Sequence, residues 1–154
     1  MKLYLVQHAK AASKDVKPER PLTDEGRRDI QKVVAFIEGL NLEVDLLWHS
    51  GKTRAAQTAE ALAQVVKVKT QMTARDGLSP NDDVAAMKDE LISSRQDVMI
   101  VGHLPFLSKL ASLLLTGNEA AGTVAFQQGG IVAFEQPAEG RWQINWMVIP
   151  ELFA

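Results

Sequence analysis

The sequence predicts an α/β protein: a three-layer α/β/α sandwich with a mainly parallel six-stranded sheet and a C-terminal antiparallel hairpin. Short apolar runs alternate with segments whose apolar residues recur at helical spacing, which is the pattern of strands joined by crossover helices. Near the end of the chain, two strand-like runs flank residues 137–140, a Pro-Ala-Glu-Gly turn signal. The length of 154 residues suits a single domain, 1–154, around one core.

Composition limits the classes of function. The formal net charge is −2, so the chain has no basic excess for a nucleic-acid backbone, and we expect no nucleic-acid partner. The chain has no cysteine, which excludes disulfides and thiolate nucleophiles. The N-terminal apolar run, Leu3–Val6, is too short for a signal peptide, and no stretch approaches the roughly twenty apolar residues that span a bilayer. We therefore expect a cytoplasmic protein that does not enter membranes and, because no apolar stripe is left over, a monomer.

The first half of the chain contains three predicted strands and two predicted helices. Leu3–Val6 is a short apolar run typical of a buried strand, and Thr23 is the expected cap of the helix that follows. Val44–Trp48 is the second strand, Ser50 is the expected cap of the next helix, and Val66–Met72 is the third strand. The apolar positions of the two helices are Ile30, Val33, Val34, Ile37 and Leu40, then Ala55, Ala59, Leu62 and Val66.

The second half contains two further helices and three strands. Val98–Val101 is a compact apolar run that we expect at the centre of the sheet. The strands Ile131–Phe134 and Trp142–Ile149 form the predicted hairpin at one edge. Simple alternation puts Trp142 and Trp146 on one face, where we expect them to pack rather than bind a ligand. The apolar positions of the two helices are Val84, Met87 and Leu91, then Leu107, Leu110, Ala111 and Leu114.

Polar clusters follow three of the predicted strands directly. They are Gln7–Lys10, His49–Arg54 and Gly102–Pro105. Open α/β sheets bind ligands at the carboxyl ends of their strands, and helix N-termini attract anions. Two of the clusters open onto helices, so the sequence predicts a phosphate site at this edge of the sheet.

Four motifs occur in order along nearly the whole chain. With them the sequence resembles the histidine phosphatase (phosphoglycerate mutase-like) superfamily and, within it, the small SixA-type phosphohistidine phosphatases. The resemblance implies the same α/β fold. The motifs are Gln7-His8-Ala9-Lys10-Ala11, Arg20-Pro21-Leu22-Thr23 with Gly26, Ser50 through Arg54-Ala55-Ala56-Gln57-Thr58, and Val101-Gly102-His103-Leu104-Pro105.

The resemblance also implies roles for individual residues. His8 matches the histidine that becomes phosphorylated, Arg54 an arginine that grips phosphate oxygens, and His103 the second histidine of the pocket; Arg20 lies at the pocket rim. A neutral imidazole is a suitable nucleophile near neutral pH, and a guanidinium fork suits two phosphate oxygens. This chemistry requires no metal or other cofactor, and three widely spaced histidines without cysteine are a poor metal signature. His49 is expected to pack or hydrogen-bond outside the site.

The chain departs from the family pattern at two points. Gln7 stands where the family has an arginine. It can still donate hydrogen bonds to the phosphate, but the site lacks one positive charge, and Lys10 is a candidate to supply that charge at the phosphate. The glutamate that phosphomonoesterases use as a general acid has no clean match, and Asp76 is the nearest candidate. An oxygen leaving group needs that proton more than a protonated imidazole does, so a missing acid favours a nitrogen–phosphorus substrate.

Three functions remain open from the sequence. The first is a SixA-like phosphatase that acts on phosphohistidine in a protein or on another small phosphorylated target, through a phosphohistidine intermediate at His8. The second is a weak or inactive relative that binds a phosphorylated partner, because of Gln7. The third is a phosphomonoesterase for a metabolite, which needs an acid near His8.

Overall fold

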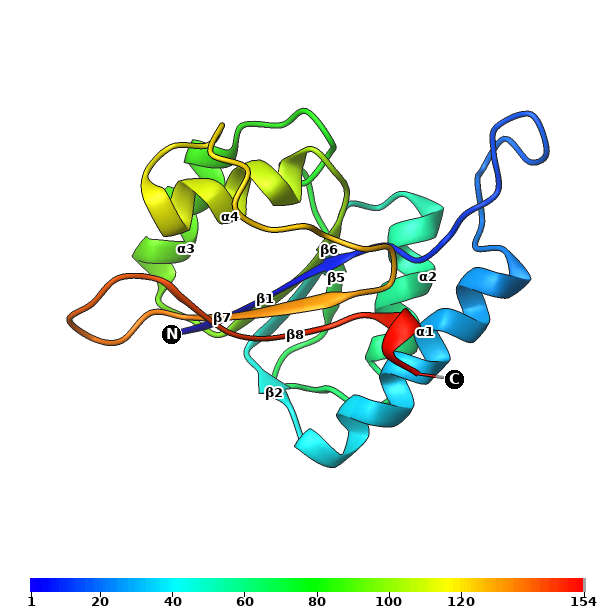
Figure 1. Cartoon of the computed structure of the whole chain (residues 1–154), viewed down its shortest axis with the longest axis horizontal. Helices are drawn as coiled ribbons and strands as arrows, with labels where there is room; N and C mark the ends of the chain where they lie inside the picture. The colour runs from blue at the N-terminus through cyan, green and yellow to red at the C-terminus, as the bar shows by residue number, and fades with distance from the viewer. Residues whose placement is uncertain (154) are drawn as a thin grey trace.

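A six-stranded sheet with the order β5-β3-β6-β1-β7-β8 forms the middle layer of the protein (Figure 1). The structure is a computed structural model that describes residues 1–153, so Ala154 of the predicted domain lies outside the described residues. The first four strands in this order run parallel, and β7 and β8 form the antiparallel hairpin. The predicted mainly parallel sheet with its C-terminal hairpin is confirmed. The strands are β1 (Lys2–Gln7), β3 (Leu46–His49), β5 (Met72–Ala74), β6 (Val98–Gly102), β7 (Ile131–Glu135) and β8 (Gln143–Val148).

Two pairs of helices cover the two faces of the sheet (Figure 1). One apolar cluster fills the space under α1 (Asp24–Ile37) and α2 (Thr53–Leu62), and a second fills the space under α3 (Val84–Ser94) and α4 (Phe106–Thr116). The apolar stripes predicted for the helices are the buried positions, apart from Leu40, which is exposed in the short 3-10 helix η1 (Glu38–Leu40). A second 3-10 helix, η2 (Pro150–Leu152), follows the hairpin. The predicted cap of α1 is confirmed, because the Thr23 hydroxyl accepts a hydrogen bond from the Gly26 N–H at 3.0 Å.

The predicted strand Val66–Met72 is wrong as a single element. Its first part, β4 (Lys67–Val68), pairs with β2 (Glu43–Val44) in a separate two-stranded sheet, and only β5 joins the main sheet. The polar residues between them cause the break. Lys69 forms an ion pair with Asp45, and the Thr70 hydroxyl donates to the Asp45 carbonyl at 2.9 Å, so this segment bends instead of continuing as a strand.

The two tryptophans of the hairpin pack as expected but on opposite faces of the sheet. Trp142 belongs to the apolar cluster under α3 and α4, whereas Trp146 lies against Tyr4 on the other face, with ring centroids 6.0 Å apart. A register shift explains the difference. Trp146 pairs with Ala133 and Ile144 pairs with Phe134, so one extra residue in β8 forms a β-bulge and reverses the alternation.

Among the helices of residues 1–153, none combines the length and the apolar character that crossing a bilayer requires.

The Gly26 backbone fits closely against the turn that follows β1. A Cβ atom at this position would lie 2.1 Å from the Lys10 carbonyl oxygen, which also accepts a hydrogen bond from the Thr23 N–H at 3.0 Å. Gly26→Ala should therefore lower the free energy of unfolding by about 2 kcal/mol, because backbone must move to admit the methyl group. Gly39→Ala is the matched control, since its Cβ would meet nothing within 4 Å. Urea unfolding of both variants tests this, and equal stabilities would contradict the close fit.

Candidate active site

The parallel strands β1, β6 and β3 lie side by side and bring three of the predicted polar clusters to one edge of the sheet. His8 follows β1, His103 follows β6, and Ser50 follows β3. The His8 N–H donates to the Gly102 carbonyl at 3.0 Å, so the end of β1 is tied directly to the end of β6. The His8 and His103 rings lie 5.2 Å apart between centroids and are tilted by 49°. The structure thus brings together two histidines that are far apart in the sequence.

The His8 side chain is buried and, among residues 1–153, one of its ring nitrogens has no hydrogen-bond partner. Its Nδ1 atom lies 2.7 Å from the Ala9 carbonyl oxygen. Because a carbonyl only accepts, Nδ1 carries the hydrogen in the neutral ring and Nε2 keeps its lone pair. Burial lowers the pKa of His8, the bond to Ala9 opposes that shift, and the positive charges of Arg54 and Arg20 lower the pKa further. His8 is therefore a neutral imidazole with a nucleophilic nitrogen at neutral pH.

His103 is held by a serine that follows β3. The Ser50 Oγ atom lies 2.6 Å from His103 Nε2 and also accepts a hydrogen bond from the Lys52 N–H at 3.3 Å. Burial and the nearby Arg54 lower the pKa of His103 to about 3. If the hydroxyl donates to Nε2, the hydrogen of the neutral ring is on Nδ1, which is buried without a hydrogen-bond partner among residues 1–153. That N–H is a donor suited to an anion.

The role predicted for Ser50 as a helix cap is therefore wrong. Helix α2 begins at Thr53 with Lys52 at its N-cap position, and no side chain of the described residues caps it. Ser50 lies too far upstream to reach the helix N–H groups that a cap serves. Sequence reasoning also missed Thr58, whose hydroxyl accepts from the Ala9 N–H at 3.0 Å and donates to the Arg54 carbonyl at 2.8 Å. Ser50 and Thr58 both belong to the motif of residues 50–58, and this motif was the sequence feature that could have indicated their roles in the site.

Arg54 lies in the first turn of α2, close to both histidines. Its Nε atom is buried and has no hydrogen-bond partner within the described part of the chain. Burial and the Arg20 charge lower the pKa of Arg54, yet a guanidinium stays protonated. Arg20 itself has φ of 52°, a conformation unusual for arginine, and its Nε donates to the Ala12 carbonyl at 3.1 Å. The positive charge of Arg20 also acts on His8 and His103, which agrees with a place at the rim.

Gln7 and Lys10 differ in their relation to this site. Gln7 is only 8% exposed, and its Oε1 atom has no hydrogen-bond partner among residues 1–153. Lys10 lies on the surface, with its Nζ atom 2.5 Å from Glu25 Oε1. Among residues 1–153, Glu25 is the hydrogen-bond partner of the Lys10 ammonium, and no hydrogen bond joins this ammonium to His8, Arg54 or His103.

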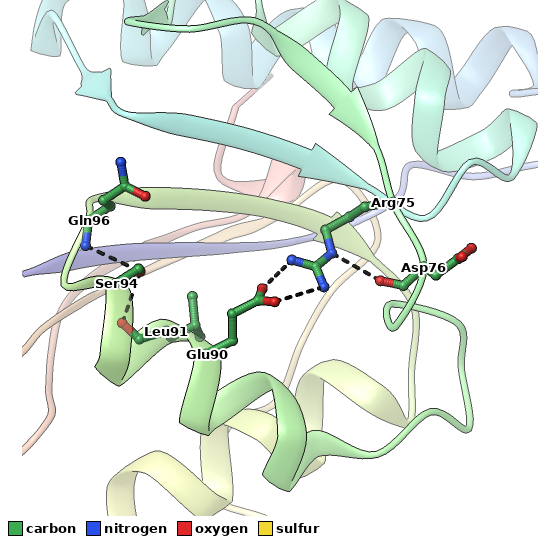
Figure 2. Close-up of polar contacts among 6 residues, drawn as sticks. All are labelled: Arg75, Asp76, Glu90, Leu91, Ser94 and Gln96. Atoms are coloured by element: carbon green, nitrogen blue, oxygen red, sulfur yellow. Dashed lines mark hydrogen bonds and ion pairs between the residues drawn. The ribbon is translucent and has the colours of Figure 1, made fainter.

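Asp76 lines a surface hollow whose other lining residues lie between Gly77 and Ala86. Figure 2 shows the Asp76 carboxylate turned away from Arg75, whose Nε donates to the Asp76 carbonyl at 2.9 Å and whose guanidinium pairs with Glu90. The hollow has a volume of about 470 Å³, and neither His8 nor His103 lines it. Within residues 1–153, no hydrogen bond or ion pair joins the Asp76 side chain to His8, Arg54 or His103. No group of acidic or histidine side chains over this range could hold a metal ion.

His49 is confirmed as a hydrogen-bonded residue at a strand end. It is 7% exposed, and its Nδ1 accepts from the Gly51 N–H at 3.0 Å.

The fold is that of an α/β protein, and the two histidines and Arg54 gather at the carboxyl edge of its sheet as groups suited to a small anion. A family model described as the histidine phosphatase superfamily (branch 1) matches residues 3–79. The chain therefore belongs to the histidine phosphatase superfamily, and this membership identifies it as a hydrolase.

Individual relatives support the resemblance to SixA-type members. Phosphohistidine phosphatase SixA from Escherichia coli (strain K12) is 23% identical over 97% of this chain and 94% of its own length. The structure of the protein histidine phosphatase SixA complexed with tungstate matches with a TM-score of 0.81 and 24% identity, over 99% of both chains. The alpha-ribazole phosphatase from Shigella flexneri matches with a TM-score of 0.74 and 16% identity, over 94% of this chain and 95% of that one.

The lowered pKa of His103 makes protein stability depend on pH. Below pH 6.5 the unfolded chain protonates this histidine, whereas the folded chain does not until about pH 3. The free energy of unfolding should therefore fall by up to about 1.4 kcal/mol for each pH unit as pH drops through this window. Urea unfolding of wild type and His103→Gln between about pH 6.5 and pH 5 checks this. We expect a shallower slope for the variant, and an unchanged slope would show that His103 titrates normally.

Proposed function

We propose that this protein is a phosphohistidine phosphatase that forms a phosphohistidine intermediate at His8. The observation that carries the proposal is the state of the His8 ring: neutral, with Nδ1 bound to the Ala9 carbonyl and Nε2 free, beside Arg54 and His103. The substrate is a phosphorylated protein or a small phosphorylated molecule. The superfamily membership supports the reaction type, and the similarity to SixA supports the phosphohistidine substrate.

The reaction takes place in two displacements at phosphorus. His8 Nε2 attacks the phosphoryl group, the bond to the leaving group breaks, and that electron pair goes to the leaving group. The charge on the equatorial oxygens is stabilised by the Arg54 guanidinium and the His103 Nδ1–H, because phosphoryl transfer depends mainly on positioning and electrostatics. Water then attacks the phosphorus, the Nε2–P bond breaks, and inorganic phosphate leaves while His8 regains its lone pair.

The position of Asp76 favours a nitrogen leaving group over an oxygen leaving group. An alkoxide needs a proton from an acid as it leaves, and Asp76 lines a separate hollow. A phosphorylated imidazole that is already protonated departs as neutral imidazole and needs no such acid. This weighs against a phosphomonoesterase that uses Asp76.

A second candidate function follows from Gln7. A member that lacks the family's arginine at this position has one positive charge fewer for the transition state. It could bind a phosphorylated partner through Arg54 without turning it over. Such a module would bind tungstate in an Arg54-dependent manner but would never become phosphorylated.

Phosphorylation of His8 is the direct test. Incubation with labelled phosphoimidazole, followed by rapid quenching at alkaline pH, should trap label on wild type and none on His8→Ala. His49→Ala is the matched control, because that histidine is also buried at a strand end but lies outside the site. It should label as wild type does. Wild type that never labels, while still binding tungstate, would favour the recognition module.

Gln7→Arg tests whether the missing charge limits the rate. A charge-assisted hydrogen bond contributes about 1.5–3 kcal/mol, so the variant should turn over phosphoramidate, a nitrogen–phosphorus donor without a ring, roughly ten- to a hundredfold faster. Gln31→Arg adds the same charge on α1 in another hollow and should leave kcat unchanged. If Gln7→Arg gives no gain, the pocket does not need the charge at this position.

A further inference from the structure

A second cavity opens directly beside the two histidine turns. Its volume is about 440 Å³, and it is lined by Gln7 and Leu104, the residues that precede His8 and follow His103. The rest of the wall comes from Lys10, from α1, from the segment before β7, and from Ile149 and η2. The space therefore adjoins the two turns that carry the histidines, and no residue of α2 lines it.

The wall before β7 is fixed to the catalytic turn rather than loosely placed. The Gly129 N–H donates to the Gln7 carbonyl at 2.9 Å and approaches the His8 carbonyl at 3.3 Å. Gly129 also fits tightly against η2, because a Cβ atom there would lie 3.1 Å from Pro150 Cγ. The hydrogen bonds of Gly129 to the Gln7 and His8 carbonyls therefore fix this wall of the cavity to the turn that carries His8.

The charges around this cavity disfavour an anion. Three carboxylates, those of Glu25, Asp29 and Glu151, and two ammonium groups, those of Lys10 and Lys32, line it. The Lys10 charge is neutralised by Glu25 at 2.5 Å. The remaining charges sum to one negative, so a second phosphate or a carboxylate would be repelled and a cation attracted.

The uncharged part of the wall suits a small planar ring that carries an N–H group. Leu104 is 40% exposed and, with Phe126, gives the cavity an apolar surface. Gln7 lines the cavity, and its Oε1, which is buried in the free protein, lacks a hydrogen-bond partner within residues 1–153. A small turn about the broad terminal torsion of glutamine would aim this oxygen at a ligand donor. An arginine at this position could only donate.

We infer that the cavity beside Gln7 is a leaving-group subsite for neutral or cationic nitrogen heterocycles of the imidazole class, and that it rejects leaving groups that carry a carboxylate or a second phosphate. The inference rests on the proposed function and adds to it the selection among phosphodonors. The heterocycle lies against Leu104 and Phe126, and its N–H donates to Gln7 Oε1. Glu151 and Asp29 favour a positive substituent on the ring.

A matched series of phosphodonors tests the subsite. The leaving groups are histamine, imidazole and imidazole-4-acetate, each phosphorylated on a ring nitrogen, so that only the substituent charge changes. For wild type we expect kcat/KM to fall in that order, with about a tenfold ratio between the first and the last. Glu151→Lys should reduce the ratio about tenfold, because it reverses one wall charge. Asp82→Asn, in the hollow of Asp76, is the control and should keep the wild-type ratio.

The outcome separates this inference from the proposed function. If all three donors label His8 with equal kcat/KM, the subsite is overturned, whereas the proposed phosphatase function is supported. If no donor labels the protein, the phosphatase proposal fails, and binding of free histamine and imidazole-4-acetate decides the subsite. Chemical-shift titration of the Gln7 and Gln127 side-chain amides measures that binding. Tighter binding of histamine, weakened in Glu151→Lys, supports the subsite, and equal binding of the two ligands overturns it.

Discussion

The parallel pairing of β1 with β6, and of β6 with β3, is the constraint on which the site depends. Each of these strands ends at the same edge, so the residues that follow them meet although the chain separates them widely. The bond from the His8 N–H to the Gly102 carbonyl extends this pairing by one residue into the turns. The buried Thr58 hydroxyl then joins Ala9 to the Arg54 carbonyl and so ties α2 to the same turn. The geometry of the side chains follows from backbone hydrogen bonds.

The burial that positions these side chains also lowers the stability of the protein without a ligand. His8 and His103 are kept neutral, and Arg54 Nε, His103 Nδ1 and Gln7 Oε1 are buried without partners within residues 1–153. Unpaired buried polar atoms cost about 1–3 kcal/mol each. Such a cluster is expected where a ligand supplies the missing partners, and a tetrahedral anion can accept from the first two. Gln7 Oε1 is instead an acceptor, so it needs a hydrogen-bond donor and not an anion.

The predictions that succeeded rest on local chemistry. Thr23 caps α1 because its hydroxyl reaches an N–H three residues away, and the apolar stripes of the helices face the core because their period is fixed by helix geometry. Those that failed depend on partners distant in the chain. Ser50 turns to His103 instead of capping α2, and the segment after Val66 bends because Lys69 and Thr70 bind Asp45. The bulge that separates Trp142 from Trp146 arises from pairing with β7.

By itself, the sequence determined the α/β class, the order of the elements and the residue types at the carboxyl ends of three strands. Periodicity and adjacency along the chain carry that information. Only the tertiary structure decided that His103 is held by Ser50, that Lys10 binds Glu25, that Asp76 lies in another hollow and that Gln7 also lines a second cavity. These features depend on distances between side chains from different elements, and such distances exist only once the sheet and helices have packed.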